Sequence, residues 1–427
     1  MTHYALICPA TTGHLNPMLS LGKVLQQRGH QVTLIGFENA QSATLAAGLD
    51  FQVIAPQDCP KEMMAQKLAE LGKLSGLAAL KYTVNLLKEN TNLLLRDVPD
   101  IAKAIGVEAF LIDQVTPAGG TVAEYLDRPF VTICSAVVLN REITIPPGLT
   151  AWNYDPSWRG KLRNQVGYQL QAQIVKPITQ VINHYREQWQ LSQHFSPNDR
   201  YSSLAQISQQ PPLLEFPRQE LPTYFHFTGP FHSAVSRTVV DFPWEQLTDK
   251  PLIYASLGTL QNQLLGIFQQ IAEACANLEA QLVISLGRSI NPLSLPPLPR
   301  NPLVVEYAPQ LDLLQRATLT ITHAGLNTTL DSLSNGVPLV AIPITNDQPG
   351  TAARIAWSGC GEFIPVKKVT VNRLRQTIQK VLTEPSYRQN ALRLQANIHQ
   401  SGGVEQAATL IEQAITTGKP VERIPSI

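Results

Sequence analysis

Residues 319–331 have the sequence Leu-Thr-Ile-Thr-His-Ala-Gly-Leu-Asn-Thr-Thr-Leu-Asp, an apolar strand that passes through His323 and Gly325 into a helix beginning near Asn327. A buried strand that leads directly into a helix is the repeating unit of parallel α/β folds. Gly325 lets the backbone approach a ligand closely, and the free amides at a helix start attract an anion such as a diphosphate. Ligands of open α/β sheets bind beyond the carboxyl ends of the strands. The stretch therefore predicts an α/β fold with an anion site after this strand.

The same alternation of short apolar strands and helical stretches occurs at both ends of the chain. We expect strands at residues 4–8, 31–35, 51–54, 109–112, 130–134, 252–256, 282–285, 303–306, 319–322 and 339–342. The 427 residues are too many for one compact core, and the pattern lapses into Pro- and aromatic-rich sequence over residues 215–250. We therefore predict an N-terminal domain over 1–230, a linker over 231–250 and a C-terminal domain over 251–427, with the last helix packed back on the N-terminal domain.

The first helix carries its own boundary signals. Asn16 is a suitable cap, and Pro17 suits a first helical position because it has no amide hydrogen. Apolar residues then recur at helical spacing as far as Leu25, and Gly29 follows. We expect this helix to begin at Pro17.

Composition and charge exclude several classes of protein. Hydrophobic residues make up 44% of the chain and charged residues 15%, and the net charge of +1 comes without a block of Lys or Arg. These values favour a globular fold over disorder and exclude nucleic acid as a partner. Five scattered cysteines without a Cys-x-x-Cys pair predict neither a disulfide framework nor a zinc site. The absence of a basic and apolar leader and of an 18-residue apolar run predicts a cytoplasmic protein.

Each polar residue of the candidate anion site also has a simpler interpretation. Asn327 suits a helix cap, and His323 suits a histidine whose hydrogen bonds are satisfied at a strand end. Asp347 and Gln348 precede Pro349, so either one suits a cap of the next helix. As a donor, His323 could carry charge, whereas Asn327 and Thr328 are neutral. Singly these residues do not decide the function.

Together, three segments resemble the donor-binding signature of the nucleotide-sugar-dependent glycosyltransferases that make natural-product glycosides (family 1). The segments are Tyr307-Ala-Pro-Gln310, residues 322–331 and Pro343-Ile-Thr-Asn-Asp-Gln-Pro349. The resemblance covers nearly the whole chain, including Thr12-Gly-His-Leu-Asn-Pro17 and Ser256-Leu-Gly-Thr259. It implies the GT-B architecture, in which two Rossmann-like domains face each other across a cleft.

The resemblance also implies roles for individual residues on the donor side. Tyr307 would stack on uracil with Gln310 at the base, and Asp331 would bind the ribose hydroxyls. His323, Asn327 and Thr328 would hold the diphosphate, and Asp347 and Gln348 would bind the sugar hydroxyls. Thr259 and Gly325 complete the implied donor-binding set. Two positions depart from the plant form, since Tyr307 replaces Trp and Asp331 replaces Glu. The implied donor is a uridine diphosphate sugar, with glucose favoured by Asp347 and Gln348.

A candidate acid–base pair follows the strands of the first half. Attack of an alcohol on an anomeric carbon needs a base that removes the proton as the bond forms, and histidine suits this near pH 7. His14 follows the first strand, and Asp113 ends another strand at the same edge, where a carboxylate could orient the imidazole. A strand-end histidine without a catalytic role is the alternative. The family resemblance places the catalytic His and Asp at these two positions.

The leaving diphosphate needs fixed donors where charge develops, and His323 with the helix start would supply them. The chain has no Asp-x-Asp motif of the kind that binds a metal, so we expect no metal. We also expect no cofactor, because the UDP-sugar is a substrate. Direct attack from the opposite face predicts inversion at the anomeric carbon.

The acceptor side is similar to the bacterial carotenoid glucosyltransferases of the zeaxanthin type. The similarity lies in residues 113–114, 117–124, 133–142, 146–147 and 152–154. A membrane-dissolved acceptor would imply peripheral membrane contact and would fit the leucine-rich segments 61–105 and 161–191, for which ordinary packing against the sheet is the alternative. Related enzymes act on polyketides, sterols and flavonoids. We expect a monomer.

Two further functions compete with sugar transfer. A nucleotide-sugar epimerase would not need an apolar acceptor pocket, and the pair His14 and Asp113 favours transfer. A non-catalytic protein that binds sugar nucleotides or lipids would not need His14, Asp113, His323 and Gln348 together. A dehydrogenase is excluded because no Gly-x-Gly-x-x-Gly follows the first strand.

Overall fold

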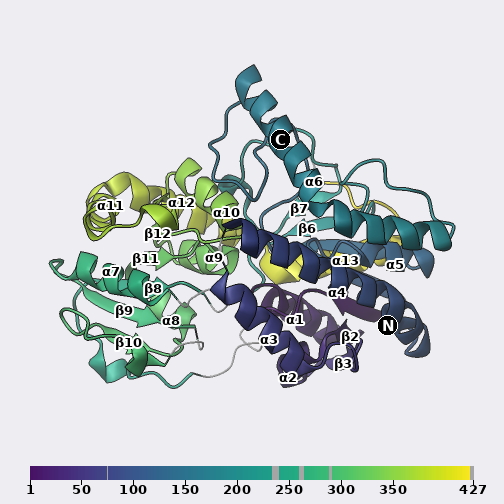
Figure 1. Ribbon diagram of the computed structural model, residues 1–427, viewed down its shortest axis with the longest axis horizontal. Helices are drawn as coiled ribbons and strands as arrows, with labels where there is room; N and C mark the ends of the chain where they lie inside the picture. The colour runs from purple at the N-terminus through teal and green to yellow at the C-terminus, as the bar shows by residue number, and fades with distance from the viewer. Residues whose placement is uncertain (75, 233–239, 259–263, 288–290, 424–427) are drawn as a thin grey trace.

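The computed structural model describes residues 1–74, 76–232, 240–258, 264–287 and 291–423. Within these residues it contains two separate parallel β-sheets. Figure 1 shows the first sheet and its helices on the right and the second on the left.

The first sheet has the strand order β3-β2-β1-β4-β5-β6-β7, with every neighbouring pair parallel. Its strands are β1 (His3–Ile7), β2 (Gln31–Gly36), β3 (Asp50–Val53), β4 (Ala109–Asp113), β5 (Phe130–Cys134), β6 (Gln206–Ser208) and β7 (Phe225–Phe227). Its helices are α1 (Thr12–Gln27), α2 (Gln41–Ala46), α3 (Lys61–Lys73), α4 (Gly76–Ala104), α5 (Gly119–Tyr125) and α6 (Trp158–Gln188).

The second sheet has the order β10-β9-β8-β11-β12-β13 and is also parallel throughout. Its strands are β8 (Leu252–Ser256), β9 (Gln281–Ser285), β10 (Leu303–Val305), β11 (Ala317–Thr322), β12 (Leu339–Ala341) and β13 (Gly361–Phe363). The helices of this half and the C-terminal end are α7 (Leu265–Cys275), α8 (Gln310–Leu314), α9 (Leu326–Ser334), α10 (Gln348–Trp357), α11 (Val371–Thr383), α12 (Pro385–Gln400) and α13 (Gly403–Thr417).

The central strand β1 shows why both faces of the first sheet are covered. All five of its residues are buried, as parallel strands between two helix layers require. Tyr4 and Leu6 pack into one core with α1 and α13, whereas Ala5 and Ile7 pack into the opposite core with α4 and α6. Helix α13, drawn yellow in Figure 1, comes from the far end of the chain and contributes six buried residues to the core of the first sheet.

Helix α1 begins earlier than its sequence signals indicate. The expected start at Pro17 is wrong, because the helix starts at Thr12 and Pro17 lies inside it. A proline inside a helix has no amide hydrogen to donate to the carbonyl four residues earlier, which here belongs to Gly13. That carbonyl finds another donor, described below.

Candidate active site

The predicted acid–base pair is assembled at the carboxyl edge of the first sheet. Asp113 ends β4, and His14 lies in the first turn of α1 directly after β1, which is the neighbouring strand. The Nδ1 atom of His14 lies 2.9 Å from Oδ2 of Asp113. The other oxygen of Asp113 accepts the amide hydrogen of Val115 at 3.0 Å. The carboxylate is fully buried, and these two contacts fix its orientation.

The surroundings of His14 favour its protonated form. Burial lowers the pKa of His14, but the charge and hydrogen bond of Asp113 and the charge of Asp347 outweigh burial, so the pKa lies above its usual value. Because the carboxylate of Asp113 can only accept, Nδ1 of His14 carries the hydrogen. The Nε2 atom is then the lone-pair site of the neutral ring, which suits a general base.

Asp347 brings a carboxylate from the second half to the neighbourhood of His14. It immediately precedes α10, and its side chain does not cap that helix, so the simple capping interpretation is wrong. Burial raises the pKa of Asp347, while His14 and hydrogen bonds from the amides of Asp347 itself and of Val137 oppose this rise. Val137 belongs to the first half of the chain, so Asp347 connects the two halves beside the candidate base.

His323 lies at the end of β11 between two glycines. A Cβ atom at Gly258 would lie 2.6 Å from Nε2 of His323, and one at Gly325 would lie 2.5 Å from the same atom. Burial lowers the pKa of His323 to about 4, although a hydrogen bond with the backbone of Ser256 acts to raise it. The expectation of a charged donor is therefore corrected, since the ring of His323 is neutral near pH 7. The ring fills the space that the two glycines leave open.

The backbone between His323 and α9 is strained. Ala324 has φ +66°, in the left-handed region that a residue with a Cβ seldom adopts. Its amide donates to Oγ1 of Thr322 at 3.3 Å. Gly325 then occupies the position before α9, where no side chain caps the helix. The amides at this helix start therefore remain available to a ligand, as the sequence predicts.

Asn327 is engaged with the first half of the chain. Its Nδ2 donates to the carbonyl oxygen of Gly13 at 2.8 Å, and its Oδ1 accepts from Nε2 of Gln209 at 2.8 Å. The Gly13 carbonyl is the one that Pro17 leaves without a donor in α1. Gln209 also donates to the carbonyl of Ser135 at 2.7 Å. Asn327 therefore holds the residue next to His14, and a contact with diphosphate would compete with these bonds.

The predicted ribose carboxylate, Asp331, belongs to a network of side chains. Its Oδ2 accepts from Nε2 of Gln310 at 2.6 Å, and its Oδ1 lies 2.6 Å from Nε2 of His232. Oε1 of Gln310 accepts from the hydroxyls of Thr328 at 3.4 Å and Tyr254 at 3.3 Å. His232 was not among the predicted site residues, because it lies in the irregular linker, where no pattern marks it. Ribose binding at Asp331 would require His232 or Gln310 to exchange its bond.

Of the other predicted donor residues, the structure describes Gln348 and Tyr307 but not Thr259. Oε1 of Gln348 accepts from the amides of Ile344 at 2.9 Å and Thr345 at 3.0 Å, so only its NH₂ group is left for a sugar. Tyr307 is half-buried between β10 and α8. Thr259 lies outside the described residues. The structure thus places Gln348 and Asp347 at the start of α10, as expected.

A buried ion pair joins the two halves away from His14. Oε1 of Glu215 accepts from Nε of Arg354 at 2.9 Å, and both side chains are almost fully buried. Burial raises the pKa of Glu215, but the charges of Arg354 and Arg218 outweigh this, so the pKa lies below its usual value. The guanidinium of Arg354 also lies 4.6 Å from the ring centre of Phe216. No sequence pattern indicates this pair.

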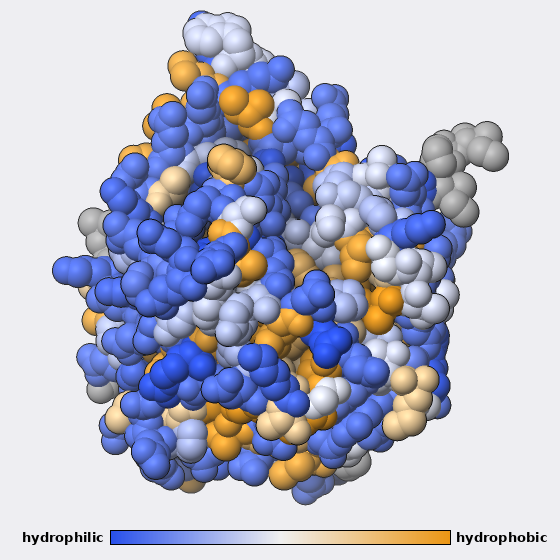
Figure 2. All heavy atoms as spheres, turned by 90° about the vertical axis from the view of Figure 1, so that its right-hand side faces the viewer, coloured by the Kyte–Doolittle hydropathy of each residue, from blue (hydrophilic) through white to orange (hydrophobic). Residues whose placement is uncertain are grey.

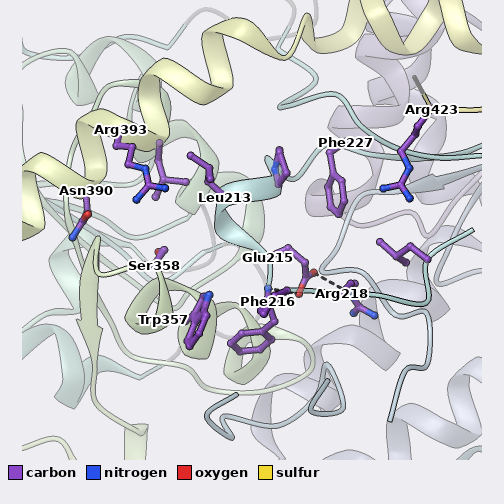
Figure 3. A pocket seen from close by; sticks show the side chains of 14 residues that line it. Leu213, Glu215, Phe216, Arg218, Phe227, Trp357, Ser358, Asn390, Arg393 and Arg423 are labelled. Carbon is purple, nitrogen blue, oxygen red and sulfur yellow. Dashed lines mark hydrogen bonds and ion pairs between the residues drawn. The ribbon is translucent and has the colours of Figure 1, made fainter. Parts of the chain in front are cut away.

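A cavity of about 490 Å³ opens beside this ion pair. Figure 3 shows Phe216, Trp357 and Leu213 around it, with the guanidinium groups of Arg218, Arg393 and Arg423 at the edges. Neither His14 nor His323 lines this cavity. It therefore lies outside the candidate catalytic site.

The described residues contain neither a metal-binding cluster nor a membrane-spanning helix. No group of three or more His, Cys, Asp or Glu side chains in this part of the chain is placed to hold a metal ion. Among the same residues, no helix combines the length and apolarity needed to cross a membrane.

Known proteins match the chain over almost its whole length. Zeaxanthin glucosyltransferases of Pantoea ananas and Pseudescherichia vulneris are 31% and 32% identical to it, covering 99% of this chain in each case and 98% and 100% of the respective relative. The solved glycotransferase of kitacinnamycin superposes with a TM-score of 0.75 at 21% identity, covering 97% of this chain and 99% of that one. This likeness confirms the predicted GT-B fold. A family model described as UDP-glucoronosyl and UDP-glucosyl transferase matches residues 4–408. The chain therefore belongs to this family and is a UDP-dependent glycosyltransferase.

Proposed function

We propose that the chain transfers glucose from UDP-glucose to a hydroxyl of an apolar acceptor, with inversion at the anomeric carbon. The observation that carries the proposal is the hydrogen bond between His14 and the buried Asp113 beside Asp347. A base, its orienting carboxylate and a candidate sugar ligand thereby gather at one edge of the first sheet.

In the proposed reaction, Nε2 of His14 takes the proton of the acceptor hydroxyl as its oxygen attacks the anomeric carbon. The bond from that carbon to the diphosphate oxygen breaks, and its electron pair leaves with UDP. Asp113 stabilises the imidazolium that forms. The amides at the start of α9 stabilise the charge that develops on the diphosphate. His323 would join them as a donor by exchanging its hydrogen bond with the backbone of Ser256.

On the sugar side, Asp347 and the NH₂ group of Gln348 are the groups that we assign to the glucose hydroxyls. Tyr307 and Gln310 would take the uracil, and Asp331 and Thr328 the ribose and diphosphate. Asn327 would support the site by holding the Gly13 carbonyl. Alternatively, Asn327 would give up its present hydrogen bonds and contact the diphosphate. Thr259 stays a predicted donor residue.

For the acceptor we propose a carotenoid, because two relatives named zeaxanthin glucosyltransferases match the full chain at 31% and 32% identity. Polyketides, sterols and flavonoids are the alternative acceptors. We further propose a cytoplasmic monomer that reaches its acceptor through peripheral membrane contact. Nucleotide-sugar epimerisation and mere sugar-nucleotide binding remain less favoured, since His14 and Asp113 are paired as a base and its orienting acid.

The test is a panel of acceptors with UDP-glucose and the purified protein, read by mass spectrometry. The panel spans hydroxylated carotenoids, sterols, flavonoids and macrolides. We expect one hexose on a carotenoid hydroxyl and no product with His14→Ala. Addition only to compact polycyclic acceptors would overturn the carotenoid proposal and leave the transfer chemistry in place.

Metal independence is a separate proposal with its own test. We expect that preincubation with EDTA, followed by dialysis, leaves the transfer rate unchanged. Loss of activity that Mg²⁺ restores would overturn the metal-free mechanism.

A further inference from the structure

Helix α6 carries a row of exposed apolar side chains that winds along its solvent-exposed half. Trp158, Leu162, Val166, Leu170 and Ile174 follow one another at intervals of four residues, with exposed fractions of 69%, 53%, 47%, 60% and 40%. Residues four apart on a helix are surface neighbours. Single exposed apolar residues are ordinary, but a contiguous row of five marks a surface that contacts something apolar. We call these five residues the α6 row.

The opposite face of α6 is anchored in the protein. Ile178 and Ile182 are buried in the core that α6 shares with α4. Nearer the start of the helix, Nδ2 of the buried Asn164 donates to the carbonyl of Ile143 at 3.1 Å. The hydroxyl of Tyr168 donates to the carbonyl of Ile145 at 3.0 Å. The α6 row is therefore not required to hold the helix in place.

The charged residues of α6 that precede Glu187 are all positive. No Asp or Glu occurs between residues 156 and 186, whereas Arg159, Lys161 and Lys176 are exposed beside the α6 row. The guanidinium of Arg159 lies 5.4 Å from the ring centre of Trp158. Asp155 lies just before the helix, and its carboxylate accepts the amide hydrogen of Ser157 at 2.9 Å. Cations flanking an apolar row with a terminal Trp match the interface of a bilayer that contains anionic lipids.

The position of α6 suits such a contact. In Figure 1 its N-terminal part projects beyond both sheets at the top of the molecule. Figure 2 shows the same projecting end with apolar side chains, in orange, among polar ones. The start of the helix contacts residues 143–145. Val137, whose amide donates to Asp347 beside His14, lies earlier in the same loop between β5 and α6. One loop therefore contacts both α6 and the candidate site.

We propose that the α6 row and its flanking cations dock the protein on an anionic lipid bilayer. This inference rests on the proposed function, since an acceptor dissolved in that bilayer would then enter the site from the side where α6 begins. The docking surface consists of the α6 row together with Arg159, Lys161 and Lys176.

The first experiment is cosedimentation of the purified chain with sucrose-loaded vesicles. Vesicles of phosphatidylcholine with 30% phosphatidylglycerol are compared with pure phosphatidylcholine. We expect the wild-type protein to partition into the anionic vesicles and the variant Leu162→Ser/Val166→Ser/Leu170→Ser to lose about tenfold or more in partition coefficient. A matched control, Leu45→Ser/Phe195→Ser/Leu293→Ser, removes three equally or more exposed apolar side chains elsewhere and should bind as the wild type does.

The second experiment tests the charges. The variant Arg159→Gln/Lys161→Gln/Lys176→Gln should lose about fivefold in partition per charge removed. Its control, Lys367→Gln/Lys368→Gln/Lys419→Gln, removes the same formal charge at exposed positions away from α6 and should bind normally. Equal binding of the wild type to neutral and anionic vesicles would overturn the proposal, as would undiminished binding of either α6 variant. So would an α6 variant that only changes the oligomeric state in analytical ultracentrifugation, because a second copy would then cover the row.

Failure of this proposal is distinguishable from failure of the proposed function. Transfer from UDP-glucose to zeaxanthin in detergent micelles tests the chemistry without a bilayer, and transfer to zeaxanthin in anionic vesicles tests both. We expect the Leu162→Ser/Val166→Ser/Leu170→Ser variant to keep its micelle rate and to lose its vesicle rate about tenfold. Product in micelles without vesicle binding would overturn the docking surface alone. Vesicle binding without product from any acceptor would overturn the proposed function alone.

Discussion

His14, Asp113 and Asp347 form a small group of interacting titratable side chains in which one imidazole faces two carboxyl groups. Asp113 is buried and bonded to Nδ1 of His14, whereas Asp347 acts through its charge. Asp113 therefore sets both the tautomer and the pKa of the candidate base. The sequence placed His14 and Asp113 correctly because strand ends of a parallel sheet share one edge, but Asp347 comes from the other half of the chain.

Replacement of Asp113 by Asn should change the pH dependence of transfer as well as its rate. Asp113 raises the pKa of His14 against burial, so its loss should lower that pKa. A base is active above its pKa, so the acidic limb of kcat/KM should move to lower pH, while kcat falls about 100-fold or more because the imidazolium loses its partner. The measurement is kcat/KM from pH 5 to 9. An acidic limb that stays in place would contradict the assignment of His14 as the base.

The two glycines that flank His323 predict a loss of donor affinity on substitution. Gly258→Ala would place a Cβ 2.6 Å from Nε2 of His323 on a backbone with φ +81°, and Gly325→Ala one at 2.5 Å. Either change forces the imidazole to move, so we expect the Kd for UDP to rise about tenfold or more. Calorimetric titration with UDP measures this.

Gly266→Ala is the matched control for these glycines. Gly266 lies in α7, and a Cβ there meets no atom within 4 Å, so UDP affinity should not change. Wild-type affinity in Gly258→Ala and Gly325→Ala would show that the position of His323 does not matter to the diphosphate.

At the scale of elements, strands with an apolar run were predictable and strands interrupted by polar residues were not. All ten expected strands overlap observed ones, since runs of buried apolar residues are a strong signal. β6, β7 and β13 were missed, although β10 and β12 are equally short, because each of the three contains a polar residue and shows no apolar run. The segment 61–105 is divided into α3, ending at Lys73, and α4, starting at Gly76. The start of α1 was misplaced because the Gly13 carbonyl, which Pro17 leaves without a donor, accepts from the distant Asn327, and local signals do not reveal this bond.

Pro17 and Asn327 should act through one carbonyl. Pro17→Ala would restore an amide that competes with Asn327 for the Gly13 oxygen, and Asn327→Ala would remove the competitor. We expect each variant to lower kcat because the Gly13–His14 backbone loses its fixed position. In a double-mutant cycle, Pro17→Ala should have little further effect on kcat once Asn327 is Ala.

The cycle also decides between two roles of Asn327. If the two kcat effects simply add, the carbonyl of Gly13 is not their shared target. A rise in the Kd for UDP in Asn327→Ala, with kcat intact at saturating donor, would assign Asn327 to the diphosphate instead.

At the scale of the whole molecule, the two sheets followed from the sequence, but the contacts between them did not. Hydrophobic pattern reports which residues are buried, not which distant segment covers them. The bond between Asn327 and Gln209 and the pair of Glu215 with Arg354 join residues more than a hundred positions apart. Such contacts depend on how the halves meet, and therefore only the structure could identify them.

The buried pair of Glu215 and Arg354 predicts how the halves hold together. Arg354→Met would leave Glu215 buried with Arg218 as its remaining cation, 3.6 Å away. Removal of one partner from a buried pair costs about 3–5 kcal/mol, so we expect the free energy of unfolding in urea to fall by that order. Lys380→Met, which breaks the exposed pair with Glu362, is the control and should lower stability far less.

The same pair should also limit stability in acid. The pKa of Glu215 is lowered on folding, so its contribution is present above the unfolded value of about 4.3 and is lost as the pH falls through the folded value. Wild type and Arg354→Met should therefore differ most in stability above that pH and converge below it. Urea titrations at a series of pH values from 7 down to 3 measure this. A difference that persists undiminished at pH 3 would mean that Arg354 stabilises the interface through packing on Phe216 rather than through charge.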